Sequence, residues 1–246
     1  MHARRLLHAP LCRTLVGGAL LGTLALAAQP EPSPPSVIQA APEVLRYEWR
    51  LEGFGGRMAR LFVPGSGNGT LTTGPSPGGK IKSELLITSQ DSEAGEFWRY
   101  AAEIDPATQA TVHAWSSYRF RGKSKSKDVP VATPGAVDVS AAIHLLRTAP
   151  PKQAMPLQIW SEGKLYPVQV LPGITERIRR DGRELIVRRY AIEGVEQPGQ
   201  RFWKGRIELA LADDPAHVPV EIILRVSLAS LRLRLLDAVA GEAPAG

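Results

Sequence analysis

The chain is dominated by strict alternation of apolar and polar side chains. From Leu45 to Leu51, apolar residues occupy every second position, with charged residues between them. Successive side chains of a β-strand point to opposite faces, so this pattern predicts a strand with one buried and one solvated face. The same alternation runs through three segments near the carboxyl end, residues 203–211, 218–226 and 231–235.

Weaker patterns of the same kind predict further strands joined by short turns. Glycines after residue 52 end the first strand, and we expect residues 58–63 to return beside it as a hairpin. Residues 64–79 are rich in Gly, Pro, Ser and Thr, which favours a loop with at most a short strand at 70–73. Three dipeptides that end in glycine fit tight turns between antiparallel strands. These are Glu162-Gly163, Pro172-Gly173 and Asp181-Gly182, and the remaining predicted strands are residues 80–88, 97–104, 111–120, 157–161, 165–171, 174–180 and 185–194.

One segment among the strands, residues 138–151, has the pattern of an amphipathic helix. Its apolar residues recur at the i, i+3, i+4, i+7 spacing of one helix face. Asp138 or Ser140 can cap its first turn, and Pro150 and Pro151 end it. A helix this short is marginal alone in water, so its apolar face must pack against the strands.

These elements together predict the fold class, which is mainly β. About eleven or twelve strands with one apolar face each cannot remain a flat sheet. We expect a curved antiparallel sheet that forms a half-barrel or barrel around the one short helix. Side chains of the helix face and of the best alternating strands are the candidate lining of a ligand site between helix and sheet. They are Tyr47, Trp49, Leu51, Val139, Ala142, Ile143, Leu146, Trp203, Ile207, Leu209, Val220, Ile222, Leu224, Leu231 and Leu233.

The two ends of the chain have a different character. Residues 1–28 begin with arginines, continue in an apolar run of about fifteen residues and end in small residues, as a secretory signal peptide does. The run is shorter than the roughly twenty residues of a spanning helix, so we expect no stable membrane span after cleavage. Residues 29–42 are proline-rich and predict an extended linker. One β-rich domain is then expected at 43–236, with a disordered tail at 237–246.

Charge and cysteine content fit an exported bacterial protein. Loss of Arg4, Arg5 and Arg13 with the signal leaves 27 basic and 24 acidic residues, which lowers the formal charge from +6 to +3. So small an excess, on an exported chain, argues against a nucleic-acid partner. The sole cysteine, Cys12, precedes the apolar run, so the mature chain has no disulfide and depends on its core. We expect a periplasmic location.

Motifs for catalysis or cofactor binding are weak. Residues 74–81 have the spacing of a phosphate loop, but Ile81 replaces the final Ser or Thr and a strand follows instead of a helix. Ser-x-x-Lys occurs at Ser124 and at Ser161, in neither case on a predicted helix, so the side chains have no reason to converge. The alternating basic residues of 121–128 are typical of an exposed hairpin tip. We therefore predict no catalytic residue and no cofactor.

Charged and histidine residues near the turns also have simpler interpretations. His217 with Asp213 and Asp214 contains ordinary metal ligands, yet an Asp-Asp-Pro-Ala-His sequence between strands is a common turn, and we predict no metal site. Asp138 and Arg147 bracket the helix, where an acid at the start and a base at the end complement the helix dipole.

Three pieces of sequence resemble an exported bacterial family. They are the strand-glycine-strand segment 47–63, the helix segment 138–147 and the late hairpin 207–222. Their order and spacing resemble domain-of-unknown-function family 3108, and the matching positions are Asp138, Arg147, Asp213, Asp214, Pro219 and Val220. Leu211 and Ala212 depart from the Trp and Ser common before the Asp pair in that family. The resemblance implies an exported β fold and brings no established activity.

The favoured functional hypothesis is a non-catalytic envelope protein. A wide apolar face with one small helix to cover it suggests a partly hollow interior for a lipid, an acyl chain or another apolar or amphiphilic ligand. The alternative is a structural or scaffolding protein that contacts another envelope protein. An enzyme of unknown type is the third class, which would require His113, His144 or His217 to share a pocket with a carboxylate or with Ser161.

Overall fold

The fold belongs to one compact unit, residues Gln39–Gly246. The computed structural model describes residues 41–53, 65–90, 95–131, 133, 135–161, 163–180, 182–226 and 229–240. The predicted signal peptide, nearly all of the predicted linker and the predicted strand at 58–63 lie outside these residues.

Thirteen strands of the described part form a single sheet. Its order is β6-β5-β4-β3-β2-β1-β13-β12-β11-β10-β9-β8-β7, and every neighbouring pair is antiparallel except β7 with β8. The strands are β1 (Glu43–Glu52), β2 (Ser66–Ser76), β3 (Lys80–Ser89), β4 (Phe97–Ile104), β5 (Thr111–Phe120), β6 (Lys123–Pro130), β7 (Ala136–Val137), β8 (Met155–Ser161), β9 (Lys164–Arg180), β10 (Arg183–Gly194), β11 (Gly205–Ala212), β12 (Pro219–Val226) and β13 (Ala229–Ala240). A short 3-10 turn, η1 (Pro77–Gly79), joins β2 to β3.

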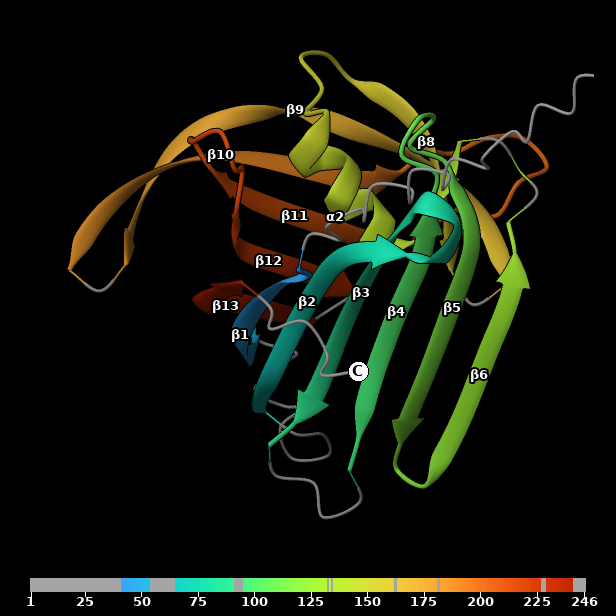
Figure 1. The fold of residues 1–246 in the computed structure, drawn as a ribbon, viewed down its shortest axis with the longest axis horizontal. Coiled ribbons are helices and arrows are strands. Elements are labelled where there is room, and N and C mark those ends of the chain that lie inside the picture. Colours follow the sequence, from blue (N-terminus) through green and yellow to red (C-terminus); the bar gives the residue numbers. More distant parts are fainter. Residues whose placement is uncertain are drawn as a thin grey trace, which may run out of the picture. The chain divides into compact units, whose positions relative to one another are not determined.

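The sheet is strongly curved and does not close. Strands β2 to β6 form one wall and β9 to β13 the other, with helix α2 (Val139–Thr148) at one end of the space between them (Figure 1). The two edge strands, β6 and β7, do not pair with each other. The predicted curved antiparallel sheet around one helix is therefore confirmed, in its open half-barrel form.

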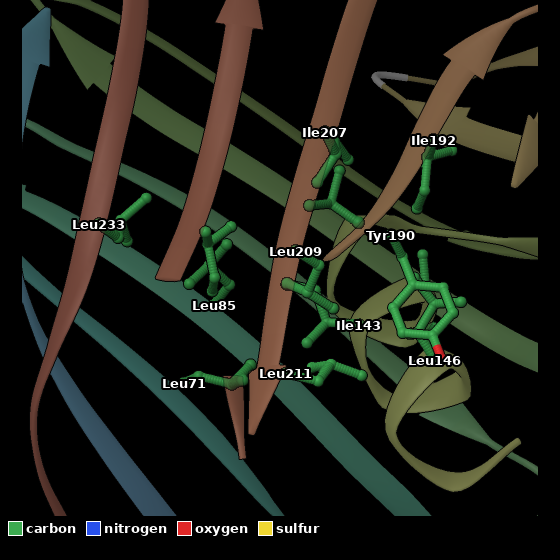
Figure 2. Packing of buried hydrophobic residues seen from close by; sticks show 14 of the residues in the cluster. Leu71, Leu85, Ile143, Leu146, Tyr190, Ile192, Ile207, Leu209, Leu211 and Leu233 are labelled. Carbon is green, nitrogen blue, oxygen red and sulfur yellow. The ribbon is translucent and has the colours of Figure 1, made fainter. Parts of the chain in front are cut away.

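A continuous core fills the space beside the helix. Register places one row of side chains on the helix-bearing face, because Ile87 is opposite Gly69, Gly69 opposite Tyr47, and Tyr47 opposite Leu235. Figure 2 shows Ile143 of the helix among leucines that come from both walls. The two walls therefore share one hydrophobic cluster, with the helix as part of it.

Helix α2 is fixed at its start by buried hydrogen bonds. Asp138 is the N-cap, and its carboxylate accepts a bond of 2.7 Å from the backbone N–H of Ala141. The hydroxyl of Ser140 donates to the carbonyl oxygen of Ser83 on β3 at 3.0 Å, and the Ser83 hydroxyl donates to the Ser140 carbonyl at 3.2 Å. The predicted helix, its cap and its buried apolar face are thus confirmed, and the helix ends two residues before Pro150.

The predicted loop at 64–79 is wrong, because most of it is the 11-residue strand β2. Its glycines serve packing and not flexibility. A side chain at Gly67 would collide with the Thr88 carbonyl and the Trp49 indole, and one at Gly69 would approach Leu233 within 2.7 Å. The neighbouring large side chains therefore occupy the space that a β-carbon would need.

The predicted turn at Pro172-Gly173 is also wrong, since β9 runs through it as one strand of 17 residues. The register of β9 with β10 shifts between Arg189 and Ala191, opposite this dipeptide. A bulge tolerates a proline because a ladder hydrogen bond is already missing there.

Two boundary predictions need smaller corrections. The basic segment 121–128 is mostly edge strand β6 and not a hairpin tip. Lysines on an edge strand discourage pairing with a strand of another chain. The disordered tail was predicted from residue 237, but residues 237–240 belong to β13, where Asp237 pairs with Arg46 of β1, and residues 241–246 lie outside the described residues.

Candidate ligand-binding face

The fifteen side chains predicted to line a ligand site all belong to the core. Eleven are buried members of the shared cluster, and the other four, Leu51, Trp203, Leu224 and Leu231, are partly buried against it. Among the described residues, Trp49 lines a pocket of about 450 Å³ between β1 and the start of β2, and Val220 lines one of about 500 Å³ beside β12. These residues pack against one another, so their role as ligand lining stays a prediction.

The helix covers only one end of the concave face. Beyond it, four aromatic side chains on β4 and β5 are half-buried: Trp98, Tyr100, Tyr118 and Phe120. Register places them on the helix-bearing face, because Trp98 is opposite both Ile87 and Tyr118, and Tyr100 is opposite Leu85. The Trp98 and Phe120 rings lie 5.4 Å apart between centroids, which is a favourable aromatic distance. We call these four residues the aromatic patch.

The aromatic patch lines a pocket of about 340 Å³. Its remaining lining residues are Arg99, Ser116 and Ser117. Pockets for small molecules usually have volumes of about 300–1,000 Å³, so this one is at the lower end of that range. It therefore has room for part of an extended chain or for one compact group.

Strand β6 adds positive charge beside the aromatic patch. In its pairing with β5, Lys123 is opposite Phe120, Lys125 opposite Tyr118, and Lys127 opposite Ser116. Directly opposite residues of an antiparallel pair point to the same face, so these three lysines share the face of the aromatic patch. We call them the lysine rim. An apolar floor with a cationic border suits an amphiphile better than a purely apolar ligand.

A second, mainly apolar pocket lies where the sheet fails to close. It has a volume of about 490 Å³ and is bordered by the β4–β5 loop, the start of β5, the β6–β7 connection, α2, β7 and β8. Leu145 of the helix, Val137 of β7 and Leu157 of β8 are among its lining residues. The open seam therefore leaves apolar side chains accessible beside the helix.

The polar groups around the helix hold its position. Burial raises the pKa of the Asp138 carboxyl to about 6, although bonds from Ala141 and Ser140 act in the opposite direction. At the other end, Arg147 forms a two-bond ion pair with Glu43 of β1, at 2.5 and 3.0 Å. Its backbone carbonyl lies 2.9 Å from Nδ1 of His217. This end is thus tied to β1 and to the connection between β11 and β12.

Burial shifts the pKa values of two side chains near this end, His144 and Tyr47. Burial lowers the pKa of His144, assisted by the charge of Arg147, and its Nε2 atom has no hydrogen-bond partner among the described residues. Burial likewise raises the pKa of Tyr47, whose hydroxyl donates to the Pro219 carbonyl at 2.8 Å. Both side chains are therefore neutral around pH 7.

The candidate chemical groups of the sequence do not assemble into a reactive centre in the described part of the chain. Asp214 accepts bonds from the backbone N–H groups of Ala216 and His217, as the turn interpretation predicted. Residues 74–81 run through the end of β2, η1 and the start of β3. His113 does meet a carboxylate, that of Asp128 at 2.5 Å, but this pair lies at the edge of the sheet and borders none of the pockets above. Within the described ranges no cluster of three metal-binding side chains occurs.

Sequence reasoning missed the aromatic patch. Trp98, Tyr100 and Tyr118 alternate with polar residues, as buried strand residues also do. The signal that could have found it is the position of these residues along their strands. A helix of ten residues cannot cover the whole length of the strands on which it packs. The aromatic residues beyond its reach remain half exposed.

Comparison with known proteins supports the fold and leaves the family open. No protein-family model matches the chain, and no curated protein matches its sequence. A β-barrel-like protein of domain of unknown function DUF1849 from Brucella abortus is similar in structure, with a TM-score of 0.52 and 10% identity over 83% of this chain and 99% of that one. LprF from Mycobacterium bovis is more distant, with a TM-score of 0.32 and 14% identity over 84% of this chain and 90% of that one. The resemblance to family 3108 therefore stays a prediction. In the described residues, no helix has the length and hydrophobicity to cross a bilayer.

Proposed function

We propose that this protein binds an amphiphile, a molecule with a long apolar chain and an acidic head, on the concave face beside β6. The proposed action is non-catalytic and takes place in the bacterial periplasm, to which the signal-like first residues would direct the chain. The observation that carries the proposal is the aromatic patch, which lies on the core side of the sheet yet beyond the cover of the helix.

The aromatic patch supports an apolar chain because its rings are only half buried in the free protein. A ligand that covers them removes apolar surface of both partners from water, which is worth about 25 cal/mol per Å². Each methylene that leaves water contributes about 0.8 kcal/mol. Since the pocket beside Trp98 and Phe120 holds about 340 Å³, only part of a long chain needs to enter it for measurable affinity.

The lysine rim supports an acidic head. Three lysines at alternate positions of an edge strand place positive charge along one border of the pocket. A carboxylate or similar head beside them would gain charge-assisted hydrogen bonds while staying partly in water. The proposal therefore includes a preference for acidic over neutral amphiphiles of equal chain length.

The proposal is tested by titrating the purified protein with palmitate and measuring displacement of a hydrophobic fluorescent probe. Phe120→Ala removes one of the four rings of the aromatic patch. We expect palmitate to bind about tenfold more weakly, which corresponds to a loss of about 1.4 kcal/mol in binding free energy. Phe97→Ala is the matched control, because Phe97 is also half-buried but lies on the opposite face of the same strand pair, opposite Arg119. Its affinity should stay within about twofold of the unchanged protein.

Two outcomes would contradict the proposal. One is the absence of palmitate binding and probe binding in the unchanged protein. The other is equal weakening by Phe120→Ala and Phe97→Ala, since the effect would then not depend on the concave face. Hexadecanol, which has the same chain length and a neutral head, should bind more weakly than palmitate, and equal binding would remove the role of the lysine rim.

A further inference from the structure

An arginine-rich groove lies on the outer face of the sheet, away from the aromatic patch. It has a volume of about 500 Å³ and lies where the end of β9 meets β12 and β13. Arg180 of β9 donates to the carbonyl of Leu236 in β13 at 3.1 Å, which holds the two strands together there. The charged residues of its lining are Arg179, Arg180, Arg189, Arg232, Arg234, Glu48 and Glu221.

Strand register explains why these charges gather. Arg234 of β13 is opposite Glu48 of β1 on one side and Glu221 of β12 on the other. Glu221 is in turn opposite Ala210, and Ala210 is opposite Arg189. Residues directly opposite each other share a face, so this row crosses five strands on the face opposite to Tyr47 and Leu209.

Glu221 is already fully engaged by two of the arginines. It lies 3.0 Å from Arg189 and 2.6 Å from Arg232, and its side chain is only 9% exposed. Each of these arginines also has a second carboxylate, Glu176 at 2.8 Å and Glu52 at 2.7 Å. This network of two arginines and three carboxylates forms the floor of the groove.

The remaining positive charge is not compensated in the same way. The nearest carboxylates to Arg234 are at 3.9 and 4.0 Å, the limit of an ion pair, and its side chain is 55% exposed. Arg179 is exposed and forms no ion pair with any described residue. The lining holds five arginines against two glutamates, and Glu176 and Glu52 add two carboxylates beneath it, so the groove keeps a small excess of positive charge.

We propose that this groove binds a phosphate group. Guanidinium groups present planar pairs of N–H donors that match phosphate oxygens, and a doubly charged anion can bridge two of them. Arg179 and Arg234 supply the donors, while the paired network of Arg189 and Glu221 keeps the floor rigid. The source can be a soluble phosphorylated molecule or a phospholipid head, because both present the same chemistry.

The test uses the full chain after signal removal, at physiological ionic strength, with inorganic pyrophosphate and with micelles of a short-chain phosphatidate. Binding is measured by isothermal titration calorimetry. The double substitution Arg179→Gln with Arg234→Gln should weaken binding by about tenfold or more, because it removes two charge-assisted contacts. Arg119→Gln is the control, since Arg119 is exposed on β5 in the other wall of the sheet, and it should change the affinity by less than about twofold.

The two probes separate the sources. Pyrophosphate binding that depends on the two arginines indicates a soluble ligand, and phosphatidate binding that depends on them, without pyrophosphate binding, indicates a lipid head. The proposal is overturned if neither probe binds, or if Arg119→Gln weakens binding as much, per charge removed, as the double substitution does. Thermal unfolding checks that each variant is folded, and Arg179→Gln alone, at an exposed position, serves if the double variant is not.

Discussion

The buried N-cap of helix α2 makes stability depend on pH. Asp138 is completely buried, and burial raises the pKa of its carboxyl from 3.8 to about 6. In the folded protein the carboxyl therefore holds its proton up to a higher pH than in the unfolded chain. Between these two values the folded state binds more protons, so the free energy of unfolding falls as the pH rises.

The size of this effect follows from the difference between the two pKa values. One pKa unit corresponds to about 1.36 kcal/mol, and because the unfolded carboxyl is already partly ionised at pH 4, Asp138 should lower stability by about 2.4 kcal/mol between pH 4 and pH 7. Asp138→Asn removes the titration and keeps a side-chain oxygen that can accept the Ala141 N–H. The variant should therefore lack this contribution, while all other groups titrate as before.

The assay is urea unfolding followed by tryptophan fluorescence, for both proteins, at several values between pH 4 and pH 7. The informative quantity is the difference in the free energy of unfolding between the unchanged protein and Asp138→Asn. We expect this difference to shift in favour of the variant by about 2.4 kcal/mol as the pH rises from 4 to 7. A difference that stays constant would refute the reasoning, because it would show that the buried carboxyl is ionised without penalty.

Three further substitutions test the packing around the helix and β1. Tyr47→Phe removes the buried bond to the Pro219 carbonyl and should cost about 1–2 kcal/mol in urea unfolding, whereas no loss would mean that water replaces the hydroxyl. Arg147→Met leaves Glu43 without its partner and should cost about 2 kcal/mol, less than a fully buried pair because Glu43 is 37% exposed; a stabilised variant would contradict this. Gly67→Ala forces a β-carbon against the backbone of β3 and should lower stability by about 3 kcal/mol, and an unchanged midpoint of thermal unfolding would show that β2 can shift away.

Much of the fold could be predicted because one face of nearly every strand is buried. Tyr47 and Trp49 are almost completely buried, and the charged residues between them are not, so alternation reports the register of β1 directly. The helix could be predicted equally well, because its cap at Asp138, its apolar spacing and the following prolines all indicate the same segment. Local pattern and tertiary structure coincide in these segments.

Other features depend on contacts that a local pattern does not contain. The glycines of β2 indicate a loop when read alone, and only the neighbouring Trp49 and Leu233 explain why a strand needs them. A bulge of β9 at Pro172-Gly173, opposite Tyr190 of β10, lets β9 continue where a turn was predicted. At such points, packing against neighbouring strands decides whether the chain turns or continues as a strand.

The candidate site was harder to predict from the sequence than the fold. An aromatic residue of the core and one of the aromatic patch have the same sequence signature, because both occupy the inner face of a strand. Tyr47 and Tyr100 differ only in what lies above them, and that depends on where the helix ends and where the sheet stays open. The arginine-rich groove likewise requires the end of β9 to reach β13, although three strands separate the two in the sheet.

The most direct measurement of the proposed function is quenching of tryptophan fluorescence by palmitate brominated along its chain, because bromine quenches only the indoles that it touches. Trp98 lies in the aromatic patch, whereas Trp115 lies on the opposite face, stacked on His113 with 4.3 Å between ring centroids. We predict that Trp98→Phe removes most of the quenching and that Trp115→Phe leaves it intact. Undiminished quenching in Trp98→Phe, or its loss in Trp115→Phe, would contradict a ligand site on the concave face.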